Sequence, residues 1–295
     1  MSDVLLVGVD GGGTACRVRV RRSNGDFVGE AEGGTANVFA GLDAALATIV
    51  ATTERALERG GLGRTDLGRC FAGLGLAGAN MSSVAEALHA RRLPFAAFGL
   101  ETDAVTACRG AFAGGEGGIA ILGTGTAYCV RARGHLTLLG GWGMLVSDQG
   151  SGADLGRRAL AAALLALDGA KPRTPFCDGV LARFDNSAEA IVEFARTALP
   201  RDFGRLAPLV WDHAEAGDPA ADRLVADSLL DIEPMLRRMI ELGAPAIALL
   251  GGQAPRYRPR LPPDLAAWLA EPAGDAMDGG IDLARSVWRA KGGAA

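Results

Sequence analysis

Residues 7–20 read VGVDGGGTACRVRV, and residues 121–133 read ILGTGTAYCVRAR. Each segment is an apolar run, a turn of glycine and threonine, and a second run that carries a cysteine and arginines at similar offsets. Apolar runs on both sides of a glycine turn are typical of a β-hairpin. Because the two segments lie far apart in the chain, they indicate one internal duplication of a β-β-β-α unit, not a short-period repeat.

The chain around the first segment predicts a three-stranded meander that passes into alternating helices and strands. Asn24-Gly25 marks a tight turn inside the meander. Apolar residues at helical spacing then run up to Gly60-Gly61, which is a helix stop signal. The expected elements are strands at 4–9, 16–22 and 27–32, a helix at 39–59, a strand at 70–77, a helix at 81–91, a strand at 95–100 and a helix at 104–112.

The second segment begins the same pattern again. We expect strands at 118–122, 127–133 and 135–139, helices near 153–167, 178–198 and 219–242, a strand at 246–250 and a closing helix near 281–289. Strands followed by helices in both halves predict two α/β units of similar architecture.

Composition excludes several classes of protein. The chain has 295 residues, of which 49% are hydrophobic, and a formal net charge of −4. This apolar fraction can bury a large core, so intrinsic disorder is excluded. Without an excess of basic residues, general binding to nucleic acid is not expected. No apolar run reaches the roughly 20 residues that a membrane span requires, and the N-terminus lacks the basic n-region of a signal peptide.

The cysteines are odd in number, scattered, and include no CxxC pair. This pattern argues against a disulfide framework or a structural zinc site and fits a reducing compartment, so we expect a cytoplasmic protein. The five residues are Cys16, Cys70, Cys108, Cys129 and Cys177.

Glycine turns after strands can bind anions, because consecutive backbone N–H groups converge there and a threonine hydroxyl adds a donor. If the two units face one another, both turns line one cleft and can hold a polyphosphate. Asp10 ends the first strand and is placed to hold a hydrated Mg²⁺. An aspartate that caps its own turn is the other interpretation of Asp10.

A second glycine motif must be weighed against this interpretation. Gly73 to Gly78 reads GLGLAG, a literal GxGxxG after a strand and before a helix. However, the unit begins with a meander and not with βαβ, so we do not expect a dinucleotide site. Three histidines without an HExxH pattern also make a zinc hydrolase a poor interpretation.

Asp103 is the candidate general base. It follows an apolar strand, and a carboxylate there can accept the proton of a substrate hydroxyl that attacks a γ-phosphate. The other interpretation makes Asp103 the N-cap of a helix that starts at Ala104. Asp148 has the same two interpretations at the start of the next long helix.

Taken together, the longer motifs resemble the sugar-kinase and actin ATPase superfamily. Within it, the chain is similar to BadF/BadG-type ATPases and, nearly end to end, to bacterial glucosamine kinases and N-acetylglucosamine kinases. The segments that carry the resemblance are DGGGT at 10–14, GEAEGGTAN up to Asn37, GLGLAGA, TDA at 102–104, GTGT, SDQGSGA at 147–153, TALPRDFG at 197–204, HAEAGDPAA at 213–221, GG at 251–252 and DAMDGG at 275–280.

The resemblance implies a role for each matching residue. It implies ATP and Mg²⁺ as cofactors, with Asp10 on the magnesium side and Asp103 as the base that also contacts the sugar. The ATP-binding residues would be Gly11, Gly12, Gly13 and Thr14 in the first phosphate loop, Gly123, Thr124, Gly125 and Thr126 in the second, and Gly251 and Gly252 at the adenosine turn. The sugar-binding residues would be Asn37, Gly78, Asp148 and the adjoining Gln149.

The resemblance also implies the fold, which is two ribonuclease-H-like α/β domains around a nucleotide cleft. We place the N-terminal domain at 1–112 and the C-terminal domain at 113–281. The last helix, from about 282 to 295, is expected to return to the N-terminal domain. A homodimer is compatible with these features.

One departure concerns the substrate. The segment before SDQG reads Gly-Trp-Gly-Met at 141–144, which is closer to N-acetylglucosamine kinases. Trp142 would stack on a sugar ring or line an acetyl pocket, and a core tryptophan is the other interpretation. We expect ATP-dependent phosphorylation of glucosamine, with N-acetylglucosamine as the alternative substrate. An ATPase that energises a protein partner is a further alternative, and the cysteines offer it no shared cluster pattern.

Overall fold

The computed structural model describes residues 4–12, 15–36, 38, 41–79 and 82–293. The chain divides into two compact units. Unit 1 comprises Met1–Gly117 and Glu271–Ala295, and unit 2 comprises Gly118–Ala270. Residues 113–117 and 271–281, which the sequence-based ranges assign to the second domain, therefore lie in unit 1.

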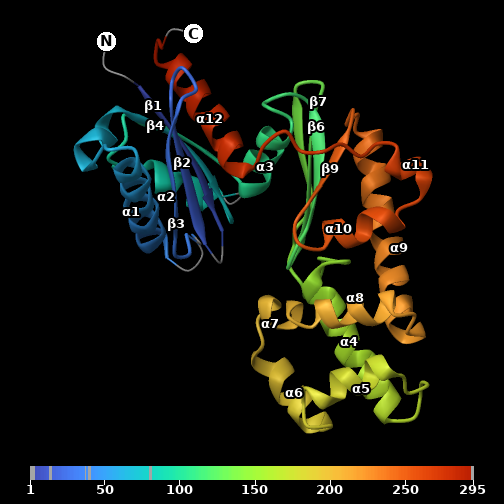
Figure 1. The fold of residues 1–295 in the computed structure, drawn as a ribbon. Coiled ribbons are helices and arrows are strands. Elements are labelled where there is room, and N and C mark those ends of the chain that lie inside the picture. Colours follow the sequence, from blue (N-terminus) through green and yellow to red (C-terminus); the bar gives the residue numbers. More distant parts are fainter. Residues whose placement is uncertain (1–3, 13–14, 37, 39–40, 80–81, 294–295) are drawn as a thin grey trace. The chain divides into compact units, whose positions relative to one another are not determined.

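Unit 1 is built on a five-stranded sheet in the order β3-β2-β1-β4-β5 (Figure 1). The first three strands form the expected antiparallel meander, and β4 and β5 continue the sheet in parallel with β1. The strands are β1 (Leu5–Gly11), β2 (Cys16–Arg22), β3 (Phe27–Gly33), β4 (Cys70–Leu76) and β5 (Ala97–Glu101). The helices are α1 (Leu42–Arg59), η1 (Arg64–Arg69), α2 (Ser82–His89), α3 (Asp103–Ala111) and α12 (Ala276–Ala290).

Helices cover both faces of this sheet, with α1 on one side and α12 on the other (Figure 1). Successive side chains of β1 therefore pack alternately on the α1 side and on the α12 side. Val7 and Val9 belong to the core on the α1 side, whereas Leu6 packs against Ile281 of α12. Because helices cover β1 on both faces, its buried side chains are apolar on both faces, as is usual for a central strand between two layers of helices.

Glycines allow α12 to approach the sheet closely. A Cβ on Gly8 would overlap the carbonyl oxygen of Met277, and one on Gly73 would overlap that of Gly280. Gly73 also lies inside β4, not at a turn between strand and helix. The GxGxxG segment therefore serves helix–sheet packing, which removes the structural basis for a dinucleotide site at this position.

Unit 2 repeats the topology of unit 1. Its sheet has the order β8-β7-β6-β9, with β9 parallel to β6, and so matches β3-β2-β1-β4 strand for strand. The predicted duplication is confirmed by this correspondence. The strands are β6 (Gly117–Leu122), β7 (Thr126–Ala132), β8 (His135–Gly140) and β9 (Ile247–Leu250).

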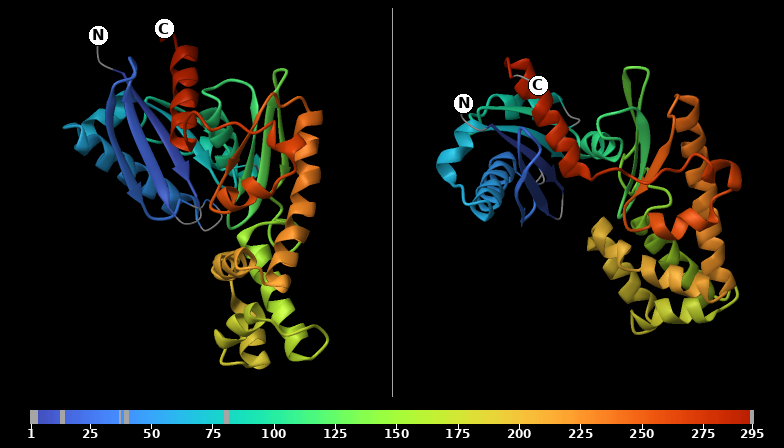
Figure 2. Two further views of the ribbon diagram at one scale, coloured as in Figure 1. Left: turned by 45° about the vertical axis from the view of Figure 1, so that its right-hand side comes forward. Right: turned by 45° about the horizontal axis from the view of Figure 1, so that its top comes forward.

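Most of unit 2 is helical. Figure 2 shows α4 to α8 gathered beyond one end of its sheet, and α9 running from them alongside the strands. These helices are α4 (Gly152–Leu167), α5 (Pro175–Ala182), α6 (Ala188–Thr197), α7 (Pro200–Gly204), α8 (Ala207–Glu215) and α9 (Pro219–Glu241); α10 (Ala254–Tyr257), η2 (Arg258–Arg260) and α11 (Pro263–Ala266) follow β9.

The single helix expected near 178–198 is wrong. Asp185 and Asn186 have φ angles of 53° and 57°, which end the helical path. Ser187 then accepts the Ala190 N–H and begins α6. Within the described residues, none of the helices has the length and apolarity that crossing a lipid bilayer would require.

Candidate active site

Two carboxylates lie near one another in unit 1. Asp10 is the penultimate residue of β1, and Asp103 begins α3 directly after β5. β1, β4 and β5 are parallel, so the ends of these strands meet at one edge of the sheet, where α/β proteins commonly bind ligands. The negative charge of Asp10 contributes to the pKa of Asp103, which places the two groups in one electrostatic environment.

Asp103 is not the N-cap of α3. The Thr102 hydroxyl accepts the Val105 N–H at 3.2 Å and caps the helix, so that interpretation of Asp103 is wrong. The Asp103 carboxylate accepts the N–H of Ala104 at 2.9 Å. Burial raises the pKa of Asp103, the backbone hydrogen bonds oppose this, and the charge of Asp10 raises it further. A carboxylate with a raised pKa is a stronger proton acceptor than an exposed one.

Asp10 has a cationic partner that sequence reasoning missed. Arg17 stands opposite Asp10 in the β1–β2 ladder, and its Nη2 lies 2.5 Å from Asp10 Oδ2. The hairpin register was the signal that could have found this pair, since the two residues flank the same turn symmetrically. Arg17 thus places a positive charge beside Asp10 at the first glycine turn.

The first glycine turn is joined to the loop after β4. The Gly12 N–H donates to the Ala15 carbonyl at 3.0 Å, and the Gly11 carbonyl accepts the Ala77 N–H at 2.9 Å. Gly78 follows with a φ of 87°, a conformation that favours glycine. The structure thus brings Gly11, Gly12 and Gly78 together, whereas the predicted site residues Gly13, Thr14 and Asn37 lie outside the described residues.

The second glycine turn packs on the start of α4. The Gly123 carbonyl accepts the Gly152 N–H at 2.8 Å, and the Thr124 carbonyl accepts the Ala153 N–H at 3.1 Å. The Gly123 N–H is used inside the turn, where it donates to Gly125. Thr124 is exposed and Thr126 is buried. Thr124 and Gly125 are therefore the residues of this turn best placed to donate backbone N–H groups to a ligand.

Asp148 lies against the same turn. Its carboxylate accepts the backbone N–H groups of Thr126 and Gly143, and a Cβ on Gly125 would lie 2.7 Å from its Oδ2. Burial raises the pKa of Asp148, and these hydrogen bonds oppose that rise. The backbone of Asp148 has a φ of 63°, which is costly for a residue other than glycine and is often found at functional sites.

Asp148 does not cap α4, because the Ser151 hydroxyl accepts the Asp154 N–H at 3.0 Å and fills that role. The N-cap interpretation of Asp148 is therefore wrong. Gln149, the next residue, is exposed. The Asp148 carboxylate is thus held against the second glycine turn, whereas the Gln149 side chain is exposed to solvent.

The predicted adenosine turn lies beside the second phosphate turn. Gly251 has a φ of 93°, and a Cβ there would lie 2.5 Å from the Leu122 carbonyl oxygen. Gly252 is exposed, and an added Cβ would meet no atom within 4 Å, which leaves room for a ligand. Gln253 was missed by sequence reasoning. Its N–H donates to Leu122, and its Oε1 accepts the Trp211 indole N–H at 2.6 Å.

Trp142 is 72% exposed, so the core-tryptophan interpretation is wrong. It lies between β8 and α4, with Leu145 and Val146 close in sequence and also exposed. An exposed indole can stack on the apolar face of a sugar ring. Its position in the chain, a few residues before Asp148, keeps that role open for Trp142.

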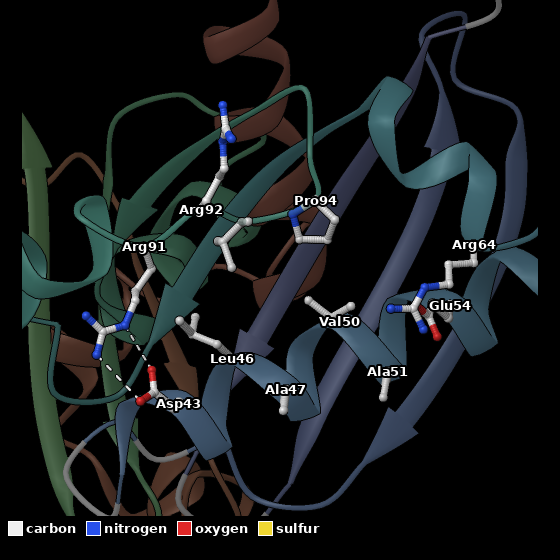
Figure 3. A pocket seen from close by; sticks show the side chains of 11 residues that line it. Asp43, Leu46, Ala47, Val50, Ala51, Glu54, Arg64, Arg91, Arg92 and Pro94 are labelled. Carbon is white, nitrogen blue, oxygen red and sulfur yellow. Dashed lines mark hydrogen bonds and ion pairs between the residues drawn. The ribbon is translucent and has the colours of Figure 1, made fainter.

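A groove of about 670 Å³ lies elsewhere on unit 1, along the outer side of α1 (Figure 3). Leu46 and Val50 contribute to its lining, and an ion pair joins Asp43 Oδ1 to Arg91 Nε at 2.9 Å at one end. None of the predicted site residues lines this groove. We therefore assign it no part in the chemistry.

Residues 7–257 match the family model described as the BadF/BadG/BcrA/BcrD ATPase family. The chain is 41% identical over 278 residues to the glucosamine kinase GspK of Vibrio cholerae, which covers 94% of this chain and 95% of that protein. It resembles the crystal structure of a candidate N-acetylglucosamine kinase from Chromobacterium violaceum with a TM-score of 0.89 at 34% identity, over 96% of this chain and 100% of that one.

A more distant likeness supports the fold alone. A ROK family glucokinase from Streptomyces griseus, solved in complex with glucose and AMPPNP, has a TM-score of 0.57 at 19% identity, over 96% of this chain and 99% of that one. The predicted fold class, two α/β units of the sugar-kinase and actin-like ATPase type, is confirmed by these matches and by the two sheets.

Proposed function

The chain belongs to the BadF/BadG/BcrA/BcrD ATPase family, and from this premise we propose that it transfers the γ-phosphoryl group of ATP to the 6-hydroxyl of D-glucosamine. The identity with the Vibrio glucosamine kinase over 94% of the chain supports the reaction class and the substrate. The single structural observation that carries the chemistry is the half-buried Asp103 carboxylate beside Asp10 at the end of the parallel strands.

Asp103 acts as general base in this proposal. Its carboxylate accepts the proton of the sugar hydroxyl while the hydroxyl oxygen forms a bond to the γ-phosphorus. The bond from the γ-phosphorus to the bridging oxygen breaks, and ADP leaves with that oxygen. Most of the rate enhancement comes from positioning and electrostatic stabilisation, because phosphoryl transfer has a loose transition state.

The glycine turns bind the nucleotide. In unit 1, Gly11, Gly12, Gly13 and Thr14 form the first phosphate loop. In unit 2, the N–H groups of Thr124 and Gly125 and the Thr124 hydroxyl donate to phosphate oxygens, whereas Gly123 and Thr126 shape the turn. Gly252 leaves space for the adenosine, and Gly251 shapes the turn by its close approach to Leu122. Backbone donors of this kind are preorganised, so they stabilise phosphate charge without reorganising during the reaction.

The residues of unit 1 also fit a magnesium ion. The described residues contain no group of three or more histidine, cysteine, aspartate or glutamate side chains that could hold a metal on their own. Mg²⁺ commonly needs only one or two carboxylates, with waters and substrate phosphates as its other ligands. Asp10 would hold it, and the bound ion would offset charge on the β- and γ-phosphates.

The sugar side of the site comprises Asn37, Gly78, Asp103, Trp142, Asp148 and Gln149 in this proposal. Glucosamine carries a cationic amine near neutral pH, so a carboxylate close to C2 favours it. N-acetylglucosamine is the second candidate substrate. It is favoured by the likeness to the Chromobacterium protein and by the exposed Trp142, whose indole could cover an acetyl group.

A coupled assay of ADP release from Mg-ATP tests the proposal, with glucosamine, N-acetylglucosamine, glucose or no sugar. A rate that is highest with glucosamine supports the proposal. Preference for N-acetylglucosamine keeps the mechanism and assigns the Trp142 segment to the acetyl group. Equal ADP release without sugar would overturn the kinase and favour an ATPase that serves a protein partner.

A further inference from the structure

The loop that carries Asp148 is held through Gly150, whose two backbone polar groups both bind side chains. The Tyr257 hydroxyl donates to the Gly150 carbonyl at 2.8 Å, and this contact is buried. The Gly150 N–H donates to Asp154 Oδ2 at 3.2 Å. Gly150 itself has a φ of 75°, and a Cβ on it would lie 2.5 Å from Ile232 Cδ1. The position therefore requires glycine and has little freedom to move.

Asp154 is a buried charge with well-placed partners. Its side chain is 5% exposed, and its Oδ2 lies 2.8 Å from Arg158 Nε. Arg158 in turn reaches Asp231 of α9, with 2.5 Å between Nη2 and Oδ2. A buried carboxylate is stable only when it is paired in this way. Through Arg158, the network connects Asp154 of α4 with Asp231 of α9. It therefore holds the carboxylate that accepts the Gly150 N–H in place.

Tyr257 connects this loop with the adenosine turn. It is the last residue of α10, a helix that starts two residues after Gly252. Its ring is fully buried and packs edge-on against Trp211, with ring centroids 4.8 Å apart. Trp211 also binds Gln253. Burial raises the pKa of Tyr257, so its hydroxyl stays protonated and remains a donor.

Asp148 depends on these contacts because its own backbone is unfavourable. A left-handed backbone at a non-glycine residue persists only where the surroundings impose it. The Asp148 carbonyl accepts the Ser151 N–H at 3.0 Å, so the turn that contains Gly150 closes directly on Asp148. If Gly150 moves, Asp148 loses both its backbone geometry and its alignment with the Thr126 N–H.

We propose that Tyr257 and Asp154 are positioning residues that hold Gly150, and thereby hold Asp148 against the Gly123–Thr126 turn in the geometry that binds the sugar. The sugar-binding role of Asp148 rests on the proposed function. The fixing of the loop does not, because it concerns only the contacts of unit 2. Neither residue needs to touch the substrate.

Tyr257→Phe tests the proposal, since it removes one hydroxyl and keeps the ring. The KM for the sugar should rise about fivefold, as expected when the buried hydroxyl no longer donates to Gly150, while the KM for ATP stays unchanged. In the ligand-free protein, hydrogen exchange at residues 150–151 should become faster. Ile191→Val is the matched control, because it weakens the core of the same unit in α6 and should alter neither the sugar KM nor this exchange.

Further variants separate positioning from general destabilisation. Asp154→Ala removes the other Gly150 partner and should raise the sugar KM in the same way. Asp148→Asn should also raise the sugar KM, and Tyr257→Phe added to it should raise that KM little further, because both act on one group. If Tyr257→Phe and Asp154→Ala change the KM for the sugar and the KM for ATP equally, and Ile191→Val causes the same changes, the proposal is overturned.

The hydrogen-exchange experiment tests whether Tyr257 and Asp154 hold the loop, and its outcome does not depend on whether the protein has kinase activity. If the wild-type protein releases no ADP in response to any sugar, the proposed function fails, and faster exchange in Tyr257→Phe still supports a held loop. Unchanged exchange at residues 150–151 in both Tyr257→Phe and Asp154→Ala would overturn the positioning role, even in an active kinase.

Discussion

Asp103 illustrates, at the scale of one residue, how a buried carboxyl reduces stability. Its carboxyl is half-buried, and its pKa is raised by burial and by the charge of Asp10. A carboxyl whose folded pKa exceeds its unfolded value destabilises the fold wherever it is ionised. That cost is absent below the unfolded pKa and develops as the pH rises through the folded pKa. The folded protein therefore carries this cost at any pH at which Asp103 is ionised.

Asp103→Asn should accordingly lower activity and raise stability. We expect kcat to fall by about 10²- to 10⁴-fold, the usual contribution of general acid–base catalysis, with ATP still bound. The thermal midpoint of the ligand-free variant at pH 7 should equal or exceed that of the wild type. The difference should shrink as the pH falls through the folded pKa of Asp103.

Asp43→Asn is the matched control, because Asp43 is an exposed carboxylate of unit 1 whose pKa is lowered by a hydrogen bond from Arg91. Its replacement should leave kcat unchanged and should not raise the midpoint. Near-normal turnover in Asp103→Asn would remove Asp103 from the role of base.

At the scale of secondary-structure elements, Asp218 connects α9 with α5. Its side chain caps α9 by accepting the N–H groups of Ala220 and Ala221, and it accepts the Phe176 N–H of α5 at 2.9 Å. Burial favours a higher pKa for Asp218, but these hydrogen bonds, with one from Thr174, outweigh it and lower the pKa. The stability that this depressed pKa contributes is present above the unfolded pKa and is lost as the pH falls through the folded one.

Asp218→Ala should cost about 2 kcal/mol at pH 7, because a cap is lost and a buried N–H keeps no partner. The loss should be smaller in acid, where the wild-type carboxylate is itself protonated. Ser187→Ala removes the cap of α6, which does not titrate, and should cost about 1 kcal/mol at both pH values. Denaturant unfolding at pH 7 and near pH 3 measures both, and a pH-independent loss in Asp218→Ala would contradict this account.

Gly279 lies where α12 packs closely against α3 within unit 1. A Cβ at this position would overlap the Thr106 carbonyl oxygen of α3 and would lie 2.7 Å from the Gly110 N. Backbone atoms cannot yield as a flexible side chain can, so Gly279→Ala should destabilise unit 1 by about 1–3 kcal/mol or more. Gly68→Ala is the control, since an added Cβ there meets nothing within 4 Å. Equal midpoints for the two variants would show that α12 tolerates displacement.

The elements also show what sequence reasoning can and cannot predict. Strands were predicted to within a few residues, because apolar runs that end in glycine have few other interpretations. The break between α5 and α6 was missed because Asp185 and Asn186 adopt left-handed backbones without being glycine. α12 was predicted too short, since Gly279 and Gly280 resemble helix breakers and are instead packing positions that only the folded sheet explains.

The site divides in the same way. Asp10, Asp103 and the glycine turns could be selected as candidates from the sequence, because each lies at the end of a strand, and their roles stay predictions. Arg17 was missed although the register of the hairpin offered a signal for it, whereas Tyr257 could not be found, since its contact lies 107 residues away in sequence. Tertiary contacts of this kind leave no local pattern.

At the scale of the whole molecule, the two units differ in the chain segments that form them. Unit 2 is one continuous segment with its own core, whereas unit 1 is completed by residues 271–295. α12 covers β1 and β4 and buries Leu6 against Ile281 and Ala284. Without α12, the centre of the unit 1 sheet would expose one apolar face along two neighbouring strands. α1 would still cover the other face, but the apolar face of β1 and β4 would be exposed to water, and central strands of this kind are normally buried on both faces.

Residues 1–117 alone should therefore fail to fold, and residues 118–270 alone should fold. Joining 271–295 to residue 117 through a flexible glycine-serine linker should restore unit 1, because the linker supplies reach without imposing structure. Cooperative thermal unfolding and a dispersed NMR spectrum would identify the folded segments. The same fusion with Gly279→Ala should unfold at a lower temperature, which ties the rescue to the seating of α12 and not to added length. Cooperative unfolding of 1–117 by itself would contradict the prediction, since the sheet would then need only α1 and α3 as cover.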